Sequence, residues 1–96
     1  MDCKVVNRKR ELFDVYIGRP SKWGNPFVIG KDGNREDVIQ KYADWIIEQP
    51  ELMKSLYELQ GKTLGCWCKP NSCHGDILKR LVDDLPITNI INGDPQ

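Results

Sequence analysis

The chain of 96 residues lacks an excess of charge of either sign, a long apolar run and any internal repeat. Fourteen basic and fourteen acidic residues cancel, so no overall charge attracts the chain to nucleic acid or to an anionic membrane. No apolar stretch approaches the ~20 residues that a membrane-spanning helix needs, and the N-terminus has no apolar signal-peptide region. We therefore expect a cytoplasmic location and no membrane partner.

Histidine is nearly absent, and this scarcity draws attention to one stretch. The single histidine, His74, lies between Cys66 and Asp76, together with three of the four cysteines. Thiols stay reduced in the cytoplasm, so these cysteines are not expected to form a disulfide framework. With one histidine there is no H-x-E partner for a zinc deaminase, and no arginine follows Cys73 at the spacing of a phosphatase loop. The stretch is still the place where thiol or metal chemistry is expected.

Two segments have the composition of strands, and helical patterns lie between and after them. Residues 12–17 are β-branched and aromatic, and residues 62–68 form a short apolar run that indicates a buried strand. Between them, a helix capped by Asn34 and a second helix from Pro50 to Leu59 are predicted. The first helix has one apolar stripe at helical spacing, made of Val38, Ile39, Tyr42, Trp45 and Ile46. A third helix is predicted from about Cys73 to Leu85, with Ser72 as its cap.

A strand–helix–strand unit places its two strands parallel, so residues 12–17 and 62–68 are expected to pair in parallel with a right-handed crossover. A further short strand at residues 3–7 could form a hairpin with 12–17. The prediction is one small α/β domain over residues 1–86, of two or three layers. It has a short, partly parallel sheet and about three helices, and residues 87–96 form a loose tail.

The parallel pairing brings two unusual loops together. Residues 18–27 and 69–76 each follow the carboxyl end of a strand, where open α/β sheets bind ligands. We therefore expect one crevice between these loops. The helix start near Gly75 offers free amides to an anion, and a guanidinium matches phosphate bidentately. The candidate ligand-binding residues are Arg19, Lys22, Trp23, Asn25, Arg35 and Gly75.

The same crevice holds the candidate catalytic groups. Cys73 lies at a helix N-terminus, where the dipole favours a thiolate, and His74 beside it could act as a base. An alternative is a zinc site with Cys66, Cys68, Cys73 and His74 as ligands, although C-x-C is tighter than the usual spacing. A third reading makes these cysteines small buried apolar side chains.

Two motifs, D-V-Y-I-G-R-P-S-K-W-G-N-P-F at 14–27 and C-W-C-K-P-N-S-C-H-G-D at 66–76, resemble the paired signatures of a known family. It is a family of small uncharacterised domains found in bacteria and their phages. The resemblance implies no activity. It implies that both loops belong to one unit, and its Cys-His-small-Asp run adds Asp76 to the catalytic candidates.

These observations lead to one functional hypothesis and two alternatives. The domain is expected to bind a nucleotide-like or phosphorylated small molecule between loops 18–27 and 69–76, as an enzyme if Cys73 and His74 react. One alternative is a zinc-stabilised interaction module that contacts nucleic acid through the basic residues Lys4, Arg8, Lys9 and Arg10. The other is a phage or host protein that sequesters its ligand without turnover.

Overall fold

The described part of the chain forms a sheet of three strands, and the most buried strand lies in its centre. The computed structural model describes residues 3–69 and 71–85. The strands are β1 (Lys4–Asn7), β2 (Val15–Tyr16) and β3 (Thr63–Cys66). The helices are α1 (Arg35–Ile46), α2 (Pro50–Ser55), the 3-10 helix η1 (Leu56–Leu59) and α3 (His74–Asp83). The predicted tail at 87–96 lies outside the described residues.

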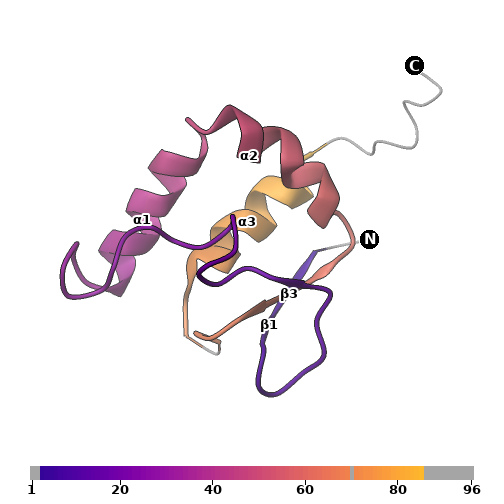
Figure 1. Cartoon of the computed structure of the whole chain (residues 1–96), viewed down its shortest axis with the longest axis horizontal. Helices are drawn as coiled ribbons and strands as arrows, with labels where there is room; N and C mark the ends of the chain where they lie inside the picture. Colours follow the sequence, from indigo (N-terminus) through magenta and orange to yellow (C-terminus); the bar gives the residue numbers. More distant parts are fainter. Residues whose placement is uncertain (1–2, 70, 86–96) are drawn as a thin grey trace.

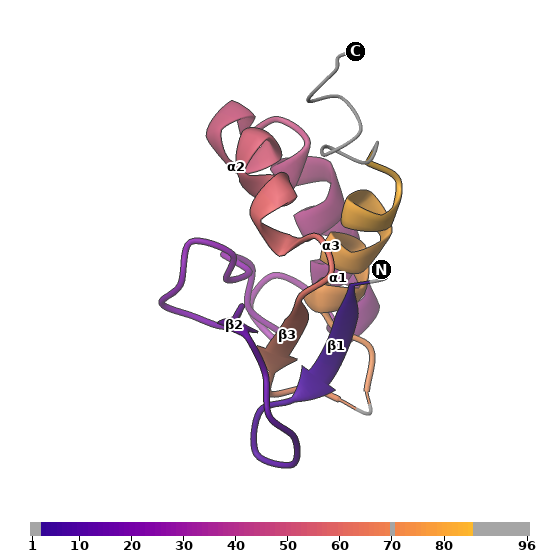
Figure 2. The same ribbon diagram turned by 90° about the vertical axis from the view of Figure 1, so that its right-hand side faces the viewer.

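Strand β3 pairs in parallel with both of its neighbours, in the order β1-β3-β2 (Figure 2). Two residues of β3 have a partner on each side: Leu64 lies opposite Val5 of β1 and Val15 of β2, and Gly65 lies opposite Val6 and Tyr16. The predicted parallel pairing of segments 12–17 and 62–68 is confirmed. The predicted hairpin is wrong, since residues 8–14 carry the chain from one edge of the sheet to the other. The apolar strand β3 is buried and takes a partner on each side, which leaves β1 and β2 apart.

The helices lie on one side of the sheet (Figure 1), so the domain has two layers. Helix α3 packs on β1 and β3 and also contacts α1 and η1. The core between the layers contains Ile17, Ile46, Leu64, Leu78 and Val82, each at most 2% exposed. This arrangement confirms a small α/β domain with a short parallel sheet. None of the helices described in residues 3–69 and 71–85 has the length and apolar character to span a membrane.

Helix α1 begins where the sequence predicts. The Asn34 side chain accepts a hydrogen bond from the Asp37 amide, and the Asp37 carboxylate accepts one from the Asn34 amide, both at 2.9 Å. This capping box satisfies two amides that the helix itself leaves unpaired. From the same helix, the Tyr42 hydroxyl donates to the Trp23 carbonyl at 2.7 Å. The contact is buried, and it holds loop 18–27 against α1.

Helix α3 begins one residue later than predicted, because Cys73 and not Ser72 is its N-cap. The Asp76 carboxylate accepts a hydrogen bond from the Cys73 amide at 3.1 Å. Ser72 was favoured because a hydroxyl is a good cap. In this capping box the Asp76 carboxylate accepts the hydrogen bond from the Cys73 amide. The Cys73 side chain accepts the bond from the Asp76 amide, which a side-chain oxygen accepts in most capping boxes.

Candidate functional site

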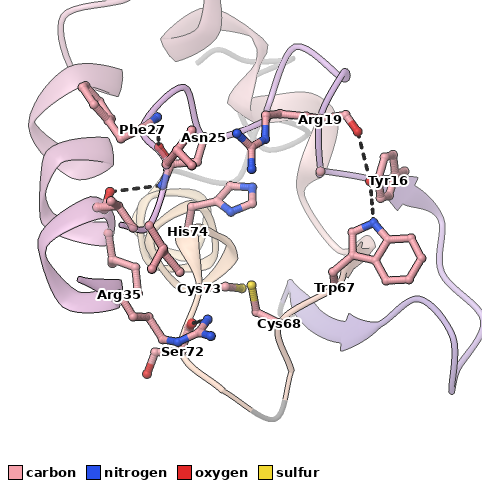
Figure 3. Close-up of a pocket in the computed structure, with 15 residues that line it drawn as sticks. Tyr16, Arg19, Asn25, Phe27, Arg35, Trp67, Cys68, Ser72, Cys73 and His74 are labelled. Atoms are coloured by element: carbon pink, nitrogen blue, oxygen red, sulfur yellow. Dashed lines mark hydrogen bonds between the residues drawn. The ribbon is translucent and has the colours of Figure 1, made fainter. Parts of the chain in front are cut away.

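A pocket of about 430 Å³ opens beyond the carboxyl ends of β2 and β3 (Figure 3). Its volume lies within the range of small-molecule sites. Both predicted loops contribute to it, as does the inner side of α1. The lining residues are Tyr16, Gly18, Arg19, Asn25, Phe27, Val28, Ile29, Arg35, Val38, Ile39, Trp67, Cys68, Ser72, Cys73 and His74. The sequence-based expectation that loops 18–27 and 69–76 face one crevice is therefore confirmed.

His74 is held in one orientation at the floor of the pocket. Its Nε2 lies 2.7 Å from the Ile17 carbonyl oxygen, and a carbonyl only accepts, so Nε2 carries the proton of the neutral ring. Burial, reinforced by the positive charge of Arg19, lowers the pKa of His74. The Tyr42 ring packs edge-on against the imidazole at 5.0 Å between centroids. The neutral ring therefore keeps Nδ1 as a hydrogen-bond acceptor in the pocket lining.

Arg19 lies at the mouth of the pocket and points its guanidinium toward the His74 ring (Figure 3). The residue is exposed, and in the described part of the chain its side chain has no ion pair and no hydrogen-bond partner. Its backbone is held near the end of the sheet, because the amide of Ile17, two residues earlier, donates to the Gly65 carbonyl of β3. A guanidinium with a fixed base and five unused N–H donors is well suited to an anionic group.

Arg35 approaches the pocket from the first turn of α1. Its Nη1 donates to the Ser72 carbonyl at 3.1 Å (Figure 3). This bond ties α1 to the loop before α3 and uses one of the five donors. Two arginines on separate elements thus line the pocket, and none of the described lining residues is acidic.

Asn25 lines the pocket, but its side chain is used to shape the loop. Its Nδ2 donates to the Val38 carbonyl at 3.1 Å, and its Oδ1 accepts from the Phe27 amide at 2.9 Å. These bonds turn the chain so that Phe27 faces the pocket. The structure gives Asn25 the role of holding the wall rather than presenting a free amide to a ligand.

Three predicted ligand contacts are not brought to the pocket. Lys22 pairs with Glu58 at 3.0 Å, on the side of the loop that faces η1. Trp23 is 2% exposed and belongs to the core. Gly75 is buried, and a Cβ there would lie 2.8 Å from Ile17 Cδ1 and 2.9 Å from Val5 Cγ1. Gly75 is therefore required for close packing of α3 on the sheet.

Cys66 and Cys73 form a buried thiol pair with their sulfur atoms 3.5 Å apart. Cys73 donates to Cys66, which lowers the pKa of Cys66 to about 6, against the effect of burial. The same hydrogen bond, together with burial, raises the pKa of Cys73. The prediction that the helix N-terminus makes Cys73 the thiolate is thus reversed by its neighbour. Cys73 faces the pocket as the proton donor of the pair, and Cys66, the more acidic thiol, lies behind it.

Asp76 does not line the pocket. Its carboxylate forms an ion pair with the Lys69 ammonium and accepts from the Cys73 amide. The anion site predicted at the start of α3 is therefore occupied by the chain's own carboxylate, and Asp76 has a structural role in this geometry.

The four candidate zinc ligands do not converge on one point. His74 turns its Nε2 to the backbone of Ile17, while Cys66 and Cys73 pair with each other. Within residues 3–69 and 71–85, no group of three or more His, Cys, Asp or Glu side chains is arranged to hold a metal ion.

Tyr16 and Trp67 are among the pocket residues that were not sequence-based candidates. The Trp67 Nε1 donates to the Tyr16 hydroxyl at 2.8 Å, which donates to the Arg19 carbonyl at 3.1 Å (Figure 3). This relay connects β3, β2 and loop 18–27 at the pocket mouth. Tyr16 and Trp67 lie at the ends of two segments that the sequence predicts to be neighbouring strands. This position could have identified them as pocket residues.

Comparison with known proteins places the chain in a family. Residues 3–84 match the family described as Domain of unknown function (DUF4326). The chain belongs to the DUF4326 family. It is similar to an uncharacterised 12.4 kDa protein of Enterobacteria phage T4, encoded in the nrdA-td intergenic region, with 42% identity over 100 residues. That match covers 94% of this chain and 91% of the phage protein.

A second DUF4326-like relative is an uncharacterised protein of Acanthamoeba polyphaga mimivirus, 37% identical over 90 residues. The match covers 83% of this chain and 57% of the viral protein, so the domain spans little more than half of that relative. No solved structure matches the chain. The family and the phage relative agree with the predicted resemblance to a phage-related family of unknown function, and they assign no activity.

Proposed function

We propose that the domain binds an anionic, nucleotide-like ligand in the pocket between loops 18–27 and 69–76. The observation that carries this proposal is the charge of the pocket. The chain as a whole has no net charge, yet Arg19 and Arg35 line the pocket and no carboxylate joins them among its described lining residues. A site that collects two guanidinium groups in a neutral protein favours a phosphate-bearing ligand.

The two sides of the pocket suit the two parts of a nucleotide. Apolar side chains form one wall, which can cover a base or another flat ring. They are Phe27, Val28, Ile29, Val38 and Ile39. Arg19 lies at the mouth of the pocket, and Arg35 lies at the start of α1. The Nδ1 acceptor of His74 would receive a hydrogen bond from an N–H or O–H of the ligand.

The geometry also favours particular groups for any reaction in this pocket. His74 is neutral, oriented by Ile17 and beside Arg19, so it is the candidate general base. Cys73 is a poor nucleophile while it donates its proton to Cys66. We therefore place ligand binding first, and an enzymatic role with His74 and Cys73 second.

The test is nucleotide binding to two matched variants of the same loop. Arg19→Ala removes a pocket guanidinium, whereas Lys22→Ala removes the same charge from a side chain outside the pocket. Loss of charged hydrogen bonds costs about 1.5–3 kcal/mol, so Arg19→Ala should weaken binding by roughly 10- to 150-fold. Lys22→Ala should change Kd by less than about twofold.

Binding is measured by calorimetry with a panel of nucleoside mono-, di- and triphosphates. An unchanged Kd for Arg19→Ala, in a protein with an unchanged melting temperature, would sink the assignment. An equal loss in both variants would indicate a general charge effect instead of a site. Product analysis after incubation with the tightest ligand then distinguishes sequestering from catalysis.

A further inference from the structure

A group of basic and aromatic side chains lies next to the pocket and is not explained by it. We name it the cation–aromatic platform, and it consists of Arg8, Lys9, Tyr16 and Trp67. The Arg8 guanidinium lies 4.6 Å from the centroid of the Trp67 ring and 5.0 Å from that of Tyr16. The Lys9 ammonium lies 5.3 Å from the Trp67 centroid. Two cations thus gather on one indole.

The platform is rigid although it is exposed. The Arg8 amide donates to the Cys66 carbonyl at 2.8 Å, which fixes Arg8 to the end of β3. The Asn7 Nδ2 donates to the Lys69 carbonyl at 2.7 Å and thereby holds the turn that carries Trp67. The indole N–H is paired with Tyr16. The orientation of the ring is therefore set before any ligand arrives.

Trp67 nevertheless keeps half of its surface in solvent, at 50% exposed. An indole buries more apolar area than almost any side chain and is highly buried on average. Its only polar atom is already satisfied here. A rigid indole with an open surface and two adjacent cations has the composition of sites where nucleobases stack and phosphates are held.

The platform continues into the pocket. Tyr16 and Trp67 belong to both, whereas Arg8 and Lys9 do not line the pocket. Of the four basic residues near the N-terminus, Lys4 instead faces Glu11 at 3.8 Å. Arg8 and Lys9 lie on the platform beside the pocket, and no described carboxylate forms an ion pair with either.

From this juxtaposition we infer that the ligand of the pocket is one nucleotide of a single-stranded nucleic acid, and that the platform holds the adjoining nucleotide. The inference rests on the proposed function, because the first nucleotide occupies the pocket. The next base stacks on Trp67, and the phosphates that flank it contact Arg8 and Lys9. A free mononucleotide would satisfy the pocket and leave the platform unused.

The experiment compares a mononucleotide with short oligonucleotides of the same base, by fluorescence anisotropy and calorimetry. Stacking of one base is worth about 5- to 150-fold in affinity, so a fluorescein-labelled ten-nucleotide strand should bind at least about fivefold more tightly than the mononucleotide. The double variant Arg8→Gln/Lys9→Gln should reduce this advantage, because the phosphate contacts are lost while Trp67 remains. Two lost phosphate contacts should also flatten the dependence of log Kd on log salt concentration by roughly 1.4.

The same double variant should bind the mononucleotide with unchanged affinity, which also shows that it is folded. The matched control, Lys54→Gln/Lys62→Gln, removes the same charge from exposed positions elsewhere and should keep the oligonucleotide advantage. Trp67→Ala should reduce the affinity for the oligonucleotide more than that for the mononucleotide.

Four results would overturn the inference. The last of them, no binding of any nucleotide, would also overturn the proposed function. If mononucleotides bind but the strand binds no more tightly, or if Arg8→Gln/Lys9→Gln behaves as wild type, the platform has no role in binding. If a pyrophosphate-linked dinucleotide matches the strand in affinity, the ligand is a small dinucleotide. If neither mononucleotide nor strand binds, the proposed function itself fails.

Discussion

The pocket has two sides that differ in how their residues are already engaged. On the buried side, Cys73 and His74 line the pocket, and Cys66 and Gly75 lie behind them without lining it. We name these four residues the buried wall. The two thiols pair with each other, His74 bonds to the Ile17 carbonyl, and Gly75 packs against Ile17 and Val5. On the exposed rim of Arg19 and Trp67, the guanidinium has no partner among the described residues, and half of the indole surface is in solvent beside Arg8 and Lys9. The cysteine and histidine side chains, which are the most reactive groups near the pocket, thus contribute to holding the fold. The unused binding capacity lies on the rim.

The largest effect is expected from Gly75→Ala on the buried wall. The added Cβ would lie within 3 Å of methyl groups of Ile17 and Val5, and overpacking of this kind costs about 1–3 kcal/mol. In a domain of this size each kcal/mol lowers the melting temperature by roughly 4–8 °C. Thermal unfolding measures the change, with the exposed neighbour Ser72→Ala as control. An unchanged melting temperature would show that the wall is not tightly packed.

A smaller effect is expected from the pH dependence of His74. Its pKa is lowered in the folded state, so below about pH 6.5 the unfolded chain binds a proton that the folded chain does not. Stability should therefore fall as the pH is lowered below 6.5, by at most about 1.4 kcal/mol per pH unit. Because His74 is the only histidine, His74→Gln should flatten this dependence in urea unfolding between pH 5.5 and 6.5.

Cys66 contributes in a separate window, and it must be distinguished from His74. Its folded pKa of about 6 lies below the ordinary value of 9.0, so its contribution to stability rises with pH from about 6 and is complete near 9. Cys66→Ser removes that rise and leaves the slope below pH 6 in place. If His74→Gln left the slope below pH 6.5 unchanged, the imidazole would not be the buried neutral group described above.

The smallest effect on stability is expected on the rim. Arg19→Ala should change the free energy of unfolding by less than about 0.5 kcal/mol, because the side chain is exposed and has no ion pair among the described residues. Urea unfolding beside the binding measurement makes the comparison direct. A loss above 1 kcal/mol would mean that Arg19 supports the fold, and the contrast between the two sides would not hold.

The sequence predicts the placement of the site better than the use of each residue in it. Parallel pairing of β2 with β3 follows from the strand–helix–strand order, and it alone brings loop 18–27 to the start of α3. The Asn34 capping box and the apolar stripe of α1 are local patterns and are confirmed. The hairpin prediction failed because strand β3, far along the chain, competes for both partners.

The direction of individual side chains depends on contacts that a local pattern does not contain. Lys22 and Trp23 lie in the same loop as Arg19, yet the loop reverses and sends them to Glu58 and to the core. The helix N-terminus favours a thiolate at Cys73, but Cys66 approaches it from β3, and their hydrogen bond lowers the pKa of Cys66 instead. Both outcomes are set by residues distant in sequence.

The strand order described above also has a consequence for how the chain acquires its fold. β3 is the last of the described strands and is the one of these three that pairs with both others. A nascent or truncated chain that ends before Thr63 therefore has no sheet at all, since β1 and β2 do not bond to each other. Loop closure over most of the chain must precede any strand pairing, which slows folding relative to a hairpin-based sheet. The pocket and the sheet are completed in the same late event, so a partly made chain carries neither.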